Sequence, residues 1–321
     1  MTVEERERPG RAGGAGTWRR GRLLAAAAVL LGLVLGLHGL VPNAVGNVGS
    51  LVETFLPWLG LFVPLLLAGA LLRRSATAAV ATALPAVVWL GMFGGAIVDK
   101  SGPAGGLTVV SHNVGAANSD PVGTARELAA SGADVLALQE LTGSARGTYE
   151  EVLADGYPFH VVMGTVGLWS RLPLSDTRPV DVATDTTRAL RATVATDRGP
   201  LTVYVAHLGS VRVFPRNGFW TESRDGGIEA LAGALAADRA ERVVLLGDLN
   251  GTMDDRAFAA LTAQLHPVQE AAGAGFGFSW PASFPVVRSD QILVRGLTPD
   301  RAWVLPPTGS DHRPVAATLG P

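Results

Sequence analysis

Three long apolar stretches without a charged residue fill most of the first 100 residues and constrain the fold more than any other feature. They cover residues 23–41, 54–72 and 76–98. Each has roughly the 20 residues that a helix needs to span the hydrocarbon core of a bilayer, so we expect three transmembrane helices. A cleaved signal peptide is the alternative for the first stretch, which follows a basic segment. That stretch is longer than a usual signal core, however, and two more follow it.

Basic residues near these stretches predict their orientation, because Lys and Arg favour the cytoplasmic side of a membrane. Residues 1–22 are basic and Gly-rich, and we expect a disordered cytoplasmic tail there. The loop 42–53 has no Lys or Arg, whereas Arg73 and Arg74 lie between the second and third stretches. The sequence thus predicts a multi-pass protein of the cell membrane with its N-terminus in the cytoplasm and its second half outside the cytoplasm.

The chain changes character after residue 100, which gives four expected regions. Residues 1–22 are the tail, 23–100 the membrane anchor, 101–106 a Gly/Pro linker and 107–321 an extracytoplasmic domain. A fully extended linker of this length reaches only ~20 Å, so we expect the domain to lie against the outer headgroups of the membrane.

Charge and cysteine content exclude some functions. Residues 1–100 carry a net charge of +4 and residues 101–321 a net charge of −6. Because neutralisation of phosphates dominates binding to duplex DNA, the acidic second half argues against a nucleic-acid partner, although a local basic groove would still permit one. The chain has no Cys, which excludes disulfides, thiolate metal sites and a Cys nucleophile. Nothing in the sequence implies an obligate protein partner.

Strand and helix patterns alternate from residue 107 onward. Strands are expected at 107–111, 135–139, 160–163, 167–170, 189–195, 201–206, 243–246, 291–294, 301–304 and 315–318. Helices are expected at 121–130, 145–155, 226–237 and 254–265. Many strands with few helices predict two packed sheets flanked by helices.

Polar residues stand at the ends of six of these apolar runs. The run Val243–Leu246 leads into Asp248 and Asn250, which in extended backbone project the same way. Such a carboxylate and carboxamide can activate water and orient a phosphate or a metal. The other residues of this kind are Asn113, Glu140, His207, Asp290, Asp311 and His312. Each one alone also has a structural interpretation: the Asn and Asp residues as turns or caps, Glu140 as a solvated strand end and His207 as a hydrogen-bonded structural residue. The functional hypothesis depends on their occurring together.

These residues occur in an order that resembles the endonuclease/exonuclease/phosphatase (DNase I-like) superfamily over about residues 107–320. The matching motifs are Ser111-His-Asn113, Leu138-Gln-Glu140, Ser170-Arg171, Ala206-His-Leu208, Gly247-Asp-Leu-Asn250, Ser279-Trp-Pro281, Ser289-Asp290 and Ser310-Asp-His312. The resemblance implies an α/β fold, a four-layer α/β/β/α sandwich, here preceded by three transmembrane helices. One departure is Gln291, where many members of the superfamily have His.

The resemblance also implies a metal site. Glu140 would be the main ligand of a divalent ion, with Asn113 and Asp311 nearby. Hard oxygen ligands without Cys favour Mg²⁺, with Mn²⁺ as the alternative. Arg171 is either a phosphate ligand or a structural ion-pair residue.

Catalytic roles follow from the same resemblance. Asp248 would orient or deprotonate the attacking water, and Asn250 would hold that water or a phosphoryl oxygen. Asp290 would hydrogen-bond His312 and fix its tautomer. His312 and His207 would then stabilise charge on the phosphorus oxygens. The implied reaction is a metal-assisted in-line hydrolysis without a covalent intermediate.

The segment 211–224 bears on the substrate. It contains Arg212, Arg216 and Arg224 together with Phe214, Phe219 and Trp220. Such a loop can place aromatic side chains among headgroups and offer Arg to phosphates. The alternative is an ordinary surface loop that packs its aromatic side chains inward.

The order of three spans and an outward-facing domain resembles the VanJ-type teicoplanin-resistance membrane proteins. This likeness implies hydrolysis of a lipid-linked phosphate or pyrophosphate, such as undecaprenyl pyrophosphate, outside the membrane. Two alternatives remain open. One is a membrane-tethered extracellular nuclease or other phosphodiesterase, and the other is a membrane-anchored binding module without catalysis.

Overall fold

The computed structural model describes residues 19–103, 105–216 and 218–320, and the chain divides into two compact units. The first, here called the helical unit, comprises residues up to 41 together with 55–95. The second, the sandwich unit, comprises residues 42–54 together with the chain from residue 96 onward. The segment 42–54 therefore groups with the sandwich, although the sequence placed it within the anchor. Most of the tail expected to be disordered, residues 1–18, lies outside the described residues.

The helical unit contains α2 (Arg22–Gly36), α4 (Leu56–Leu59), α5 (Phe62–Leu72) and α6 (Ala76–Phe93). Gly32 of α2 lies so close to α6 that a Cβ atom there would be 2.6 Å from Leu84 Cγ. The indole of Trp89 donates to the carbonyl oxygen of Pro57 at 2.9 Å. Close packing at small residues and side-chain hydrogen bonds such as this one therefore hold these helices together. Large apolar side chains point outward, among them Leu23, Leu65, Leu72, Val80 and Val87.

The three expected spans do not all become long helices. Among the described residues, only Ala76–Ile97 has the length and apolarity to cross a bilayer as one helix. The first stretch ends as an α-helix at Gly36 after 15 residues, about 22 Å, because Leu37 leaves helical backbone. The second begins as a helix only at Leu56, with Pro57 in its first positions, so it is shorter than the expected span.

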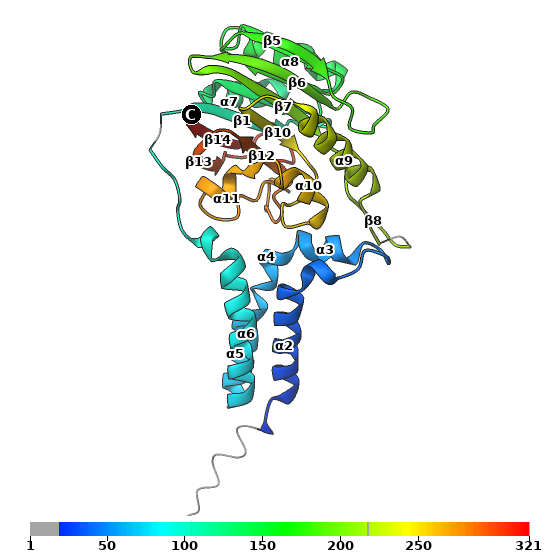
Figure 1. Ribbon diagram of the computed structural model, residues 1–321, viewed down its shortest axis with the longest axis vertical. Coiled ribbons are helices and arrows are strands. Elements are labelled where there is room, and N and C mark those ends of the chain that lie inside the picture. The colour runs from blue at the N-terminus through cyan, green and yellow to red at the C-terminus, as the bar shows by residue number, and fades with distance from the viewer. Residues whose placement is uncertain (1–18, 104, 217, 321) are drawn as a thin grey trace, which may run out of the picture. The chain divides into compact units, whose positions relative to one another are not determined.

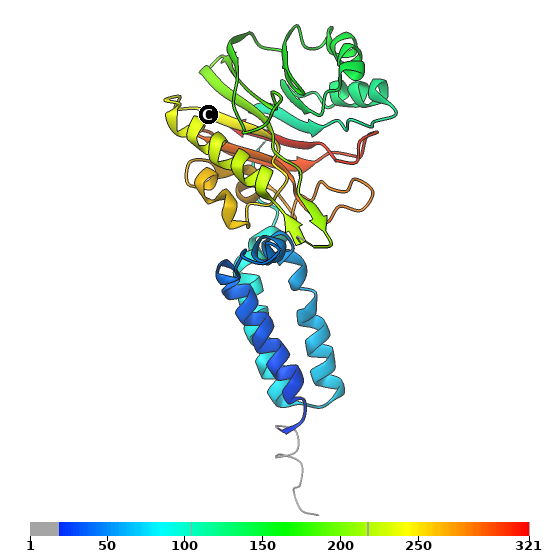
Figure 2. The same cartoon turned by 90° about the vertical axis from the view of Figure 1, so that its right-hand side faces the viewer.

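The sandwich unit is built on two six-stranded mixed sheets (Figures 1 and 2). The order of the first sheet is β13 (Thr298–Val304), β14 (Val315–Gly320), β1 (Leu107–Asn113), β2 (Val135–Gln139), β4 (Val166–Ser170) and β3 (Phe159–Met163). The order of the second is β11 (His266–Pro267), β12 (Asp290–Arg295), β10 (Val243–Asp248), β7 (Gly199–His207), β6 (Ala189–Thr196) and β5 (Leu174–Pro179). The short strands β8 (Arg212–Phe214) and β9 (Gly218–Trp220) form a separate hairpin.

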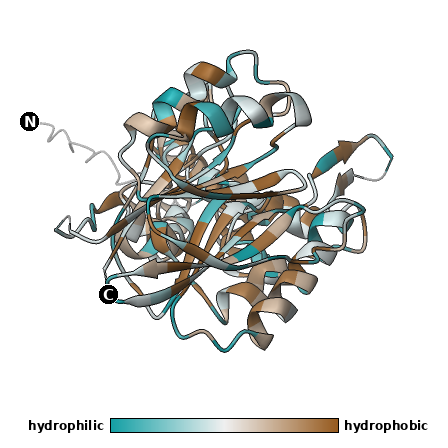
Figure 3. Cartoon of the chain, turned by 90° about the horizontal axis from the view of Figure 1, so that it is seen from above, coloured by the Kyte–Doolittle hydropathy of each residue, from teal (hydrophilic) through white to brown (hydrophobic). Residues whose placement is uncertain are grey.

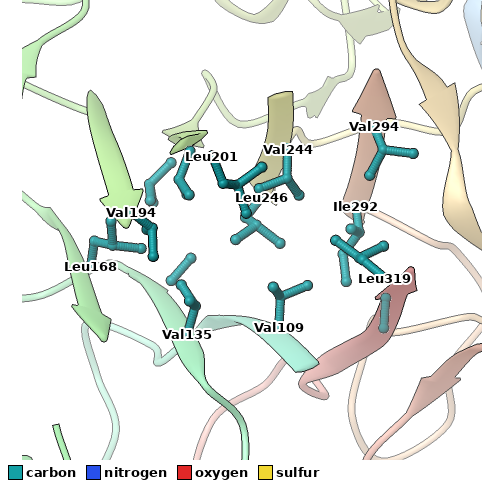
Figure 4. Close-up of a cluster of buried hydrophobic side chains, with 14 of the residues drawn as sticks. Val109, Val135, Leu168, Val194, Leu201, Val244, Leu246, Ile292, Val294 and Leu319 are labelled. Carbon is teal, nitrogen blue, oxygen red and sulfur yellow. The ribbon is translucent and has the colours of Figure 1, made fainter. Parts of the chain in front are cut away.

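Alternation along the strands builds the layers. In β10, Val244 and Leu246 face a core between the two sheets (Figure 4), while Leu245 faces the other way. Helix α9 (Glu222–Ala237) covers that outer face with residues such as Leu231. Helices α7 (Pro121–Ala130) and α8 (Gly143–Leu153) pack on the outer face of the first sheet through side chains such as Tyr149. This order is consistent with the expected α/β/β/α sandwich (Figure 2).

The remaining elements depart from the simple pattern. Strand β5 was not predicted, because its sequence LSDTRP is polar, exposed and interrupted by a bulge. The helix expected at 254–265 is instead a 3₁₀ turn, η3 (Arg256–Phe258), followed by the four-residue α10 (Ala259–Thr262). Asp255 caps that turn by accepting a hydrogen bond from the Ala257 amide at 3.0 Å. The helices α3 (Val48–Thr54) and α11 (Val268–Ala272) were also not predicted.

Candidate active site

Strand register gathers polar side chains at one end of the sandwich. In the second sheet, Asp248 at the end of β10 pairs with His207 on one side and with Asp290 on the other. The preceding residue must be Gly247, because a Cβ atom there would lie 1.9 Å from the carbonyl oxygen of Ala206. The terminal residue of β1 in the first sheet is Asn113. The period-two pairing of strands thus assembles residues that are distant in sequence.

Asp248 is the centre of this cluster and is almost completely buried. Its Oδ2 accepts a hydrogen bond from Asn113 Nδ2 at 2.9 Å, which links the two sheets. Its Oδ1 accepts from the backbone amide of Asn250 at 3.0 Å. The same Oδ2 lies 3.8 Å from Nε2 of both His207 and His312. Burial and the nearby Asp290 carboxylate raise the pKa of Asp248 to about 7.

Two residues of the cluster have left-handed backbone, Glu140 with φ 60° and Asn250 with φ 53°. This conformation is costly for a residue such as Glu and persists only where surrounding contacts hold it. Glu140 Oε2 accepts a hydrogen bond from the Ala116 amide at 2.8 Å, and its Oε1 lies 3.6 Å from His207 Nε2. Asn250 Nδ2 donates to the carbonyl oxygen of Leu208 at 3.0 Å.

His312 is held as a charged imidazole. Its Nδ1 is 2.8 Å from Asp290 Oδ2, an oxygen that also accepts from Ser279 Oγ at 2.6 Å and Ser289 Oγ at 3.1 Å. Burial opposes the charge of His312, but the carboxylates of Asp290 and Asp248 outweigh burial and raise its pKa to about 10. The hydrogen bond to Nδ1 fixes the ring so that Nε2 is the nitrogen nearer Asp248.

His207 is held in the opposite state. Its Nδ1 is 3.1 Å from Nη2 of Arg188, and because Arg can only donate, the imidazole nitrogen must accept. Burial and the charge of Arg188 lower the pKa of His207 to about 3. Arg188 did not appear among the predicted site residues, because the residues selected at strand ends were those able to bind a metal or transfer a proton. Its place in the site depends on the pairing of Ala189 with Ala206, which places the start of β6 beside the end of β7.

Serines of the quoted motifs hold the surrounding backbone. Ser310 Oγ donates to the carbonyl oxygen of Asn113 at 2.7 Å and accepts from the His312 amide at 3.1 Å. The departure at Gln291 has a local role, because its Nε2 donates to the carbonyl oxygens of Gly251 at 3.0 Å and Arg288 at 2.7 Å. These contacts tie the strand that carries Asp290 to the loop that follows Asn250.

Other predicted residues lie away from Asp248. Asp311 is exposed, and its carboxylate is 3.4 Å from Trp280 Nε1. Arg171 lies over the ring of Tyr157, 5.4 Å from its centroid, which is a structural contact. Arg224 is completely buried and forms an ion pair with Asp255 at 2.7 Å. The idea that Arg224 offers its guanidinium to phosphates is therefore wrong.

The remaining predicted substrate contacts belong to the β8–β9 hairpin. Arg212 and Arg216 are exposed there. Trp220 is half-buried, its indole donates to Glu222 Oε2 at 3.3 Å, and it packs edge-on against Phe214. Phe219 is buried, so the aromatic side chains of the segment divide between surface and interior.

The donor set fits a hard divalent cation. Glu140 and Asp248 each place an oxygen within 3.8 Å of His207 Nε2, and the amide of Asn113 adjoins Asp248. Carboxylate and amide oxygens are the ligands that Mg²⁺ and Mn²⁺ prefer. Ligand atoms of Asp248, Asp290 and His312 also lie within 4.8 Å of one another. Asp290 and His312 are hydrogen-bonded to each other, however, so these atoms are already engaged. Glu140 and Asn113 are thus the better candidate ligands.

Comparisons with known proteins agree with this fold. One family model, described as "Endonuclease/Exonuclease/phosphatase family", matches residues 110–312. No curated protein matches in sequence. Among solved structures, TDP2 of D. rerio complexed with single strand DNA product is 20% identical with a TM-score of 0.56, and 67% of this chain covers 99% of it.

Two further structures share the fold. The mannosyl-6-phosphatase Bt3783 of Bacteroides thetaiotaomicron is 17% identical with a TM-score of 0.55, and 66% of this chain covers 99% of it. The human Nocturnin catalytic domain with bound sulfate is 16% identical with a TM-score of 0.57, and 69% of this chain covers 96% of it. At these identities the likeness concerns the fold alone.

Proposed function

We infer the function from the premise that the chain belongs to the endonuclease/exonuclease/phosphatase family, whose model matches residues 110–312. Members of this family are typically phosphoester hydrolases and generally depend on a divalent metal. We propose that this chain hydrolyses a lipid-linked phosphate ester or anhydride at the outer face of a membrane. The observation that supports catalysis best is a buried Asp248 carboxylate placed between a neutral and a charged imidazole.

The proposed reaction assigns a task to each side chain around Asp248. Asp248 accepts the proton of a water molecule, whose oxygen forms a bond to phosphorus while the bond to the leaving oxygen breaks. A pKa near 7 suits this role, because the carboxylate can then gain and lose the proton at physiological pH. Asn250 orients the water. The charged His312 and the guanidinium of Arg188 stabilise negative charge on the phosphoryl oxygens.

Glu140 and Asn113 would hold the cation, with Mg²⁺ expected and Mn²⁺ as the alternative. When bound, the cation would neutralise charge on the phosphate. Asp311 stays a predicted third ligand, and its negative charge also lies near His312, where it contributes to the raised pKa.

The apolar exterior of the helical unit supports a membrane location. Leu23 and Leu72 are each 87% exposed, and Val80 and Val87 are more than half exposed. Large apolar patches of this kind are rare on monomeric soluble proteins, because apolar surface in contact with water is unfavourable by about 25 cal/mol per Å². We therefore propose that the helical unit is embedded in the bilayer, with the sandwich unit outside the cytoplasm.

The β8–β9 hairpin is a proposed contact with the lipid substrate. It stands out from the sandwich in Figure 3, and it follows His207 in the chain. Val213 is 77% exposed and Phe214 40%, and Arg212 and Arg216 flank them. Apolar side chains beside guanidinium groups match the boundary between acyl chains and phosphates.

A substrate panel with purified full-length protein in detergent tests the proposal. It spans isoprenyl pyrophosphates, phospholipids, sphingomyelin and plasmid DNA, each with Mg²⁺ and with EDTA. We expect phosphate release from the isoprenyl pyrophosphate with Mg²⁺ only, and none from an Asp248→Asn variant. Robust plasmid nicking without such release would favour a tethered nuclease, and absence of any hydrolysis would favour a binding module.

The hairpin has its own test, because a chain without Cys can be labelled at a single introduced one. An environment-sensitive fluorophore is placed at Val213→Cys in full-length protein in lipid nanodiscs. We expect quenching by nitroxide-bearing lipids. The control Asp197→Cys, in the loop between β6 and β7, should show none. Equal quenching at both positions, or none at Val213→Cys, would argue against the lipid contact.

A further inference from the structure

The segment 42–54 is part of the sandwich unit although apolar helices of the helical unit precede and follow it in sequence. It contains the short helix α3, on which Ser50 and Glu53 are completely buried. Burying a carboxylate is unfavourable unless it is paired and hydrogen-bonded. The contacts of Glu53 therefore indicate what this segment does.

Glu53 pairs with one residue of the sandwich, Arg256. Arg256 Nη2 lies 2.8 Å from Glu53 Oε1, and Arg256 Nε is 2.9 Å from the same oxygen. The backbone amide of Arg256 also donates to Glu53 Oε2 at 3.1 Å. Both carboxylate oxygens are thus engaged by a single residue, through its side chain and its backbone. Such charge-assisted, two-point contacts fix the orientation of the groups that they join.

A second contact joins the segment to the neighbouring residue. Ser50 Oγ donates to Asp255 Oδ1 at 3.3 Å, and Asn43 holds Ser50 by accepting from its amide at 2.9 Å. Asp255 Oδ2 in turn accepts from the buried Arg224 at 2.7 Å. The segment also reaches the β8–β9 hairpin, since the amide of Phe219 donates to the carbonyl oxygen of Gly46 at 2.9 Å.

These contacts lead to the catalytic loop. Gly251 directly follows Asn250, and a Cβ atom at Gly251 would lie 2.6 Å from the ring of Phe258 and 3.0 Å from Arg224 Nη1. Gly251 is therefore packed against groups that the Glu53 and Ser50 contacts hold in place. Its carbonyl oxygen accepts from Gln291, the neighbour of Asp290. A continuous set of contacts runs from α3 to the loop after Asp248 and to the strand that carries Asp290.

We propose that Glu53 and Ser50 are positioning residues of the active site. The segment between two apolar helices clamps residues 255–256, and through them it fixes the loop that carries Asn250 beside Asp248. The left-handed backbone of Asn250 needs such support, because that conformation persists only where its surroundings hold it. This inference goes beyond the proposed function, since it concerns the order of the loop and does not depend on the identity of the substrate.

Hydrogen–deuterium exchange of the full-length protein in detergent tests the clamp without relying on activity. We expect Glu53→Gln to increase exchange in peptides that cover residues 249–258, while peptides of β1 and β2 keep their protection. The matched control is Glu229→Gln, an exposed position on α9. Unchanged protection over 249–258 in a folded Glu53→Gln protein would overturn the proposal, whatever the substrate assays give.

Kinetics with bis(p-nitrophenyl) phosphate then test the consequence for catalysis. We expect Glu53→Gln to lower kcat by about 10-fold or more with little change in KM, because misplacement of a catalytic group acts on the chemical step. The exchange Glu53→Arg with Arg256→Glu restores an ion pair but not the acceptor for the Arg256 amide, so it should recover only part of the loss. A folded Glu53→Gln protein with the wild-type kcat would contradict the positioning role, as would an effect on KM alone.

A milder variant covers the case in which Glu53→Gln fails to fold. Ser50→Ala removes one hydrogen bond to Asp255 and leaves the ion pair of Glu53 intact. We expect it to fold, to lower kcat by roughly 3-fold, and to increase exchange over 249–258 to a smaller extent. The wild-type kcat together with wild-type protection in Ser50→Ala would overturn the proposal.

Discussion

The two sides of the active site hold the same kind of group in opposite states. On one side, His207 faces the guanidinium of Arg188, and its pKa is lowered to about 3. On the other, His312 faces the carboxylate of Asp290, and its pKa is raised to about 10. Both imidazoles are buried, and both lie 3.8 Å from Asp248 Oδ2.

The difference shows that burial keeps an imidazole neutral unless neighbouring carboxylates outweigh it. Burial alone lowers the pKa of any histidine. It acts alongside Arg188 at His207, whereas at His312 two carboxylates overcome it. A phosphate in the site would face the charged imidazole of His312 on one side. On the other side it would face the neutral imidazole of His207, which can form a hydrogen bond. Single substitutions of Asp290 or of Arg188 can therefore test each side separately.

The largest effect is expected from Asp248→Asn, which removes the carboxylate shared by both sides. We expect kcat for bis(p-nitrophenyl) phosphate to fall by about 10³-fold, because an amide cannot accept the proton of water. The thermal transition should fall by a few degrees, because the amide nitrogen of Asn would face a donor where an oxygen now accepts, so kcat is measured well below the transition. Asp155→Asn, at an exposed position after α8, is the control and should retain full activity. Wild-type turnover in Asp248→Asn would exclude its role as the base.

Asp290→Asn should have the next largest effect, because it removes the charge that keeps His312 protonated. We expect the pKa of His312 to fall toward its ordinary value and kcat at about pH 8 to fall by about 10²-fold, with a smaller loss at about pH 5.5. Imidazole NMR with labelled histidine measures the pKa, and a pH profile of kcat measures the consequence. A His312 pKa that stays near 10 in this variant would show that Asp290 is not the cause.

The pair of Asp290 and His312 also predicts how the free energy of unfolding depends on pH. The folded pKa of His312 lies above the unfolded value, so its contribution is complete below about pH 6.5 and is lost as pH rises through about 10. Denaturant titrations at these pH values should therefore show an alkaline loss of stability in the wild type that is reduced in Asp290→Asn. An identical alkaline loss in both proteins would assign it to other groups.

Arg188→Met tests the other side and should have a smaller effect. Without the guanidinium, the pKa of His207 should rise, although burial still holds it below its ordinary value. We expect kcat to fall by about 10-fold, which corresponds to about 1.4 kcal/mol of transition-state stabilisation. Arg198→Met, in the loop between β6 and β7, is the matched control. An unchanged kcat would remove Arg188 from the catalytic machinery.

Arg171→Met should have the smallest effect, because Arg171 contacts Tyr157 and not the cluster around Asp248. We expect a loss of stability of about 0.5–1 kcal/mol from the lost cation–π contact, with kcat and KM unchanged. Chemical denaturation measures the stability, and the phosphodiester assay measures kcat and KM. A clear rise in KM would instead support the phosphate-binding alternative for Arg171.

The sequence predicted best those strands and helices whose signals lie within a few neighbouring residues. The strand Val135–Gln139 and the helix Pro121–Ala130 have the predicted bounds, because alternation and helix signals act within a few residues. The polar residues at the strand ends were found for the same reason, and register then brings His207, Asp248 and Asp290 together. The bounds of the apolar helices were predicted less well, since the breaks near Leu37 and Phe55 are not visible in hydropathy.

Contacts between residues far apart in sequence could not be predicted. Arg224 lies in a segment rich in arginine and aromatic residues, yet its ion pair with Asp255 makes it part of the interior. Arg188 owes its place in the site to the pairing of β6 with β7. The docking of residues 42–54 depends on Arg256, which is 203 residues from Glu53. No window of sequence contains both members of these pairs.

That separation has a consequence for how the protein is made. Glu53 leaves the ribosome 203 residues before its partner Arg256, which at ordinary rates of translation means a delay of about 10–40 seconds. During this time the carboxylate of Glu53, which lies between two apolar segments, has no Arg256 to pair with. One of the earliest segments to be synthesised therefore completes its contacts only late, so a ribosome that stalls before residue 256 leaves the nascent chain without its clamp.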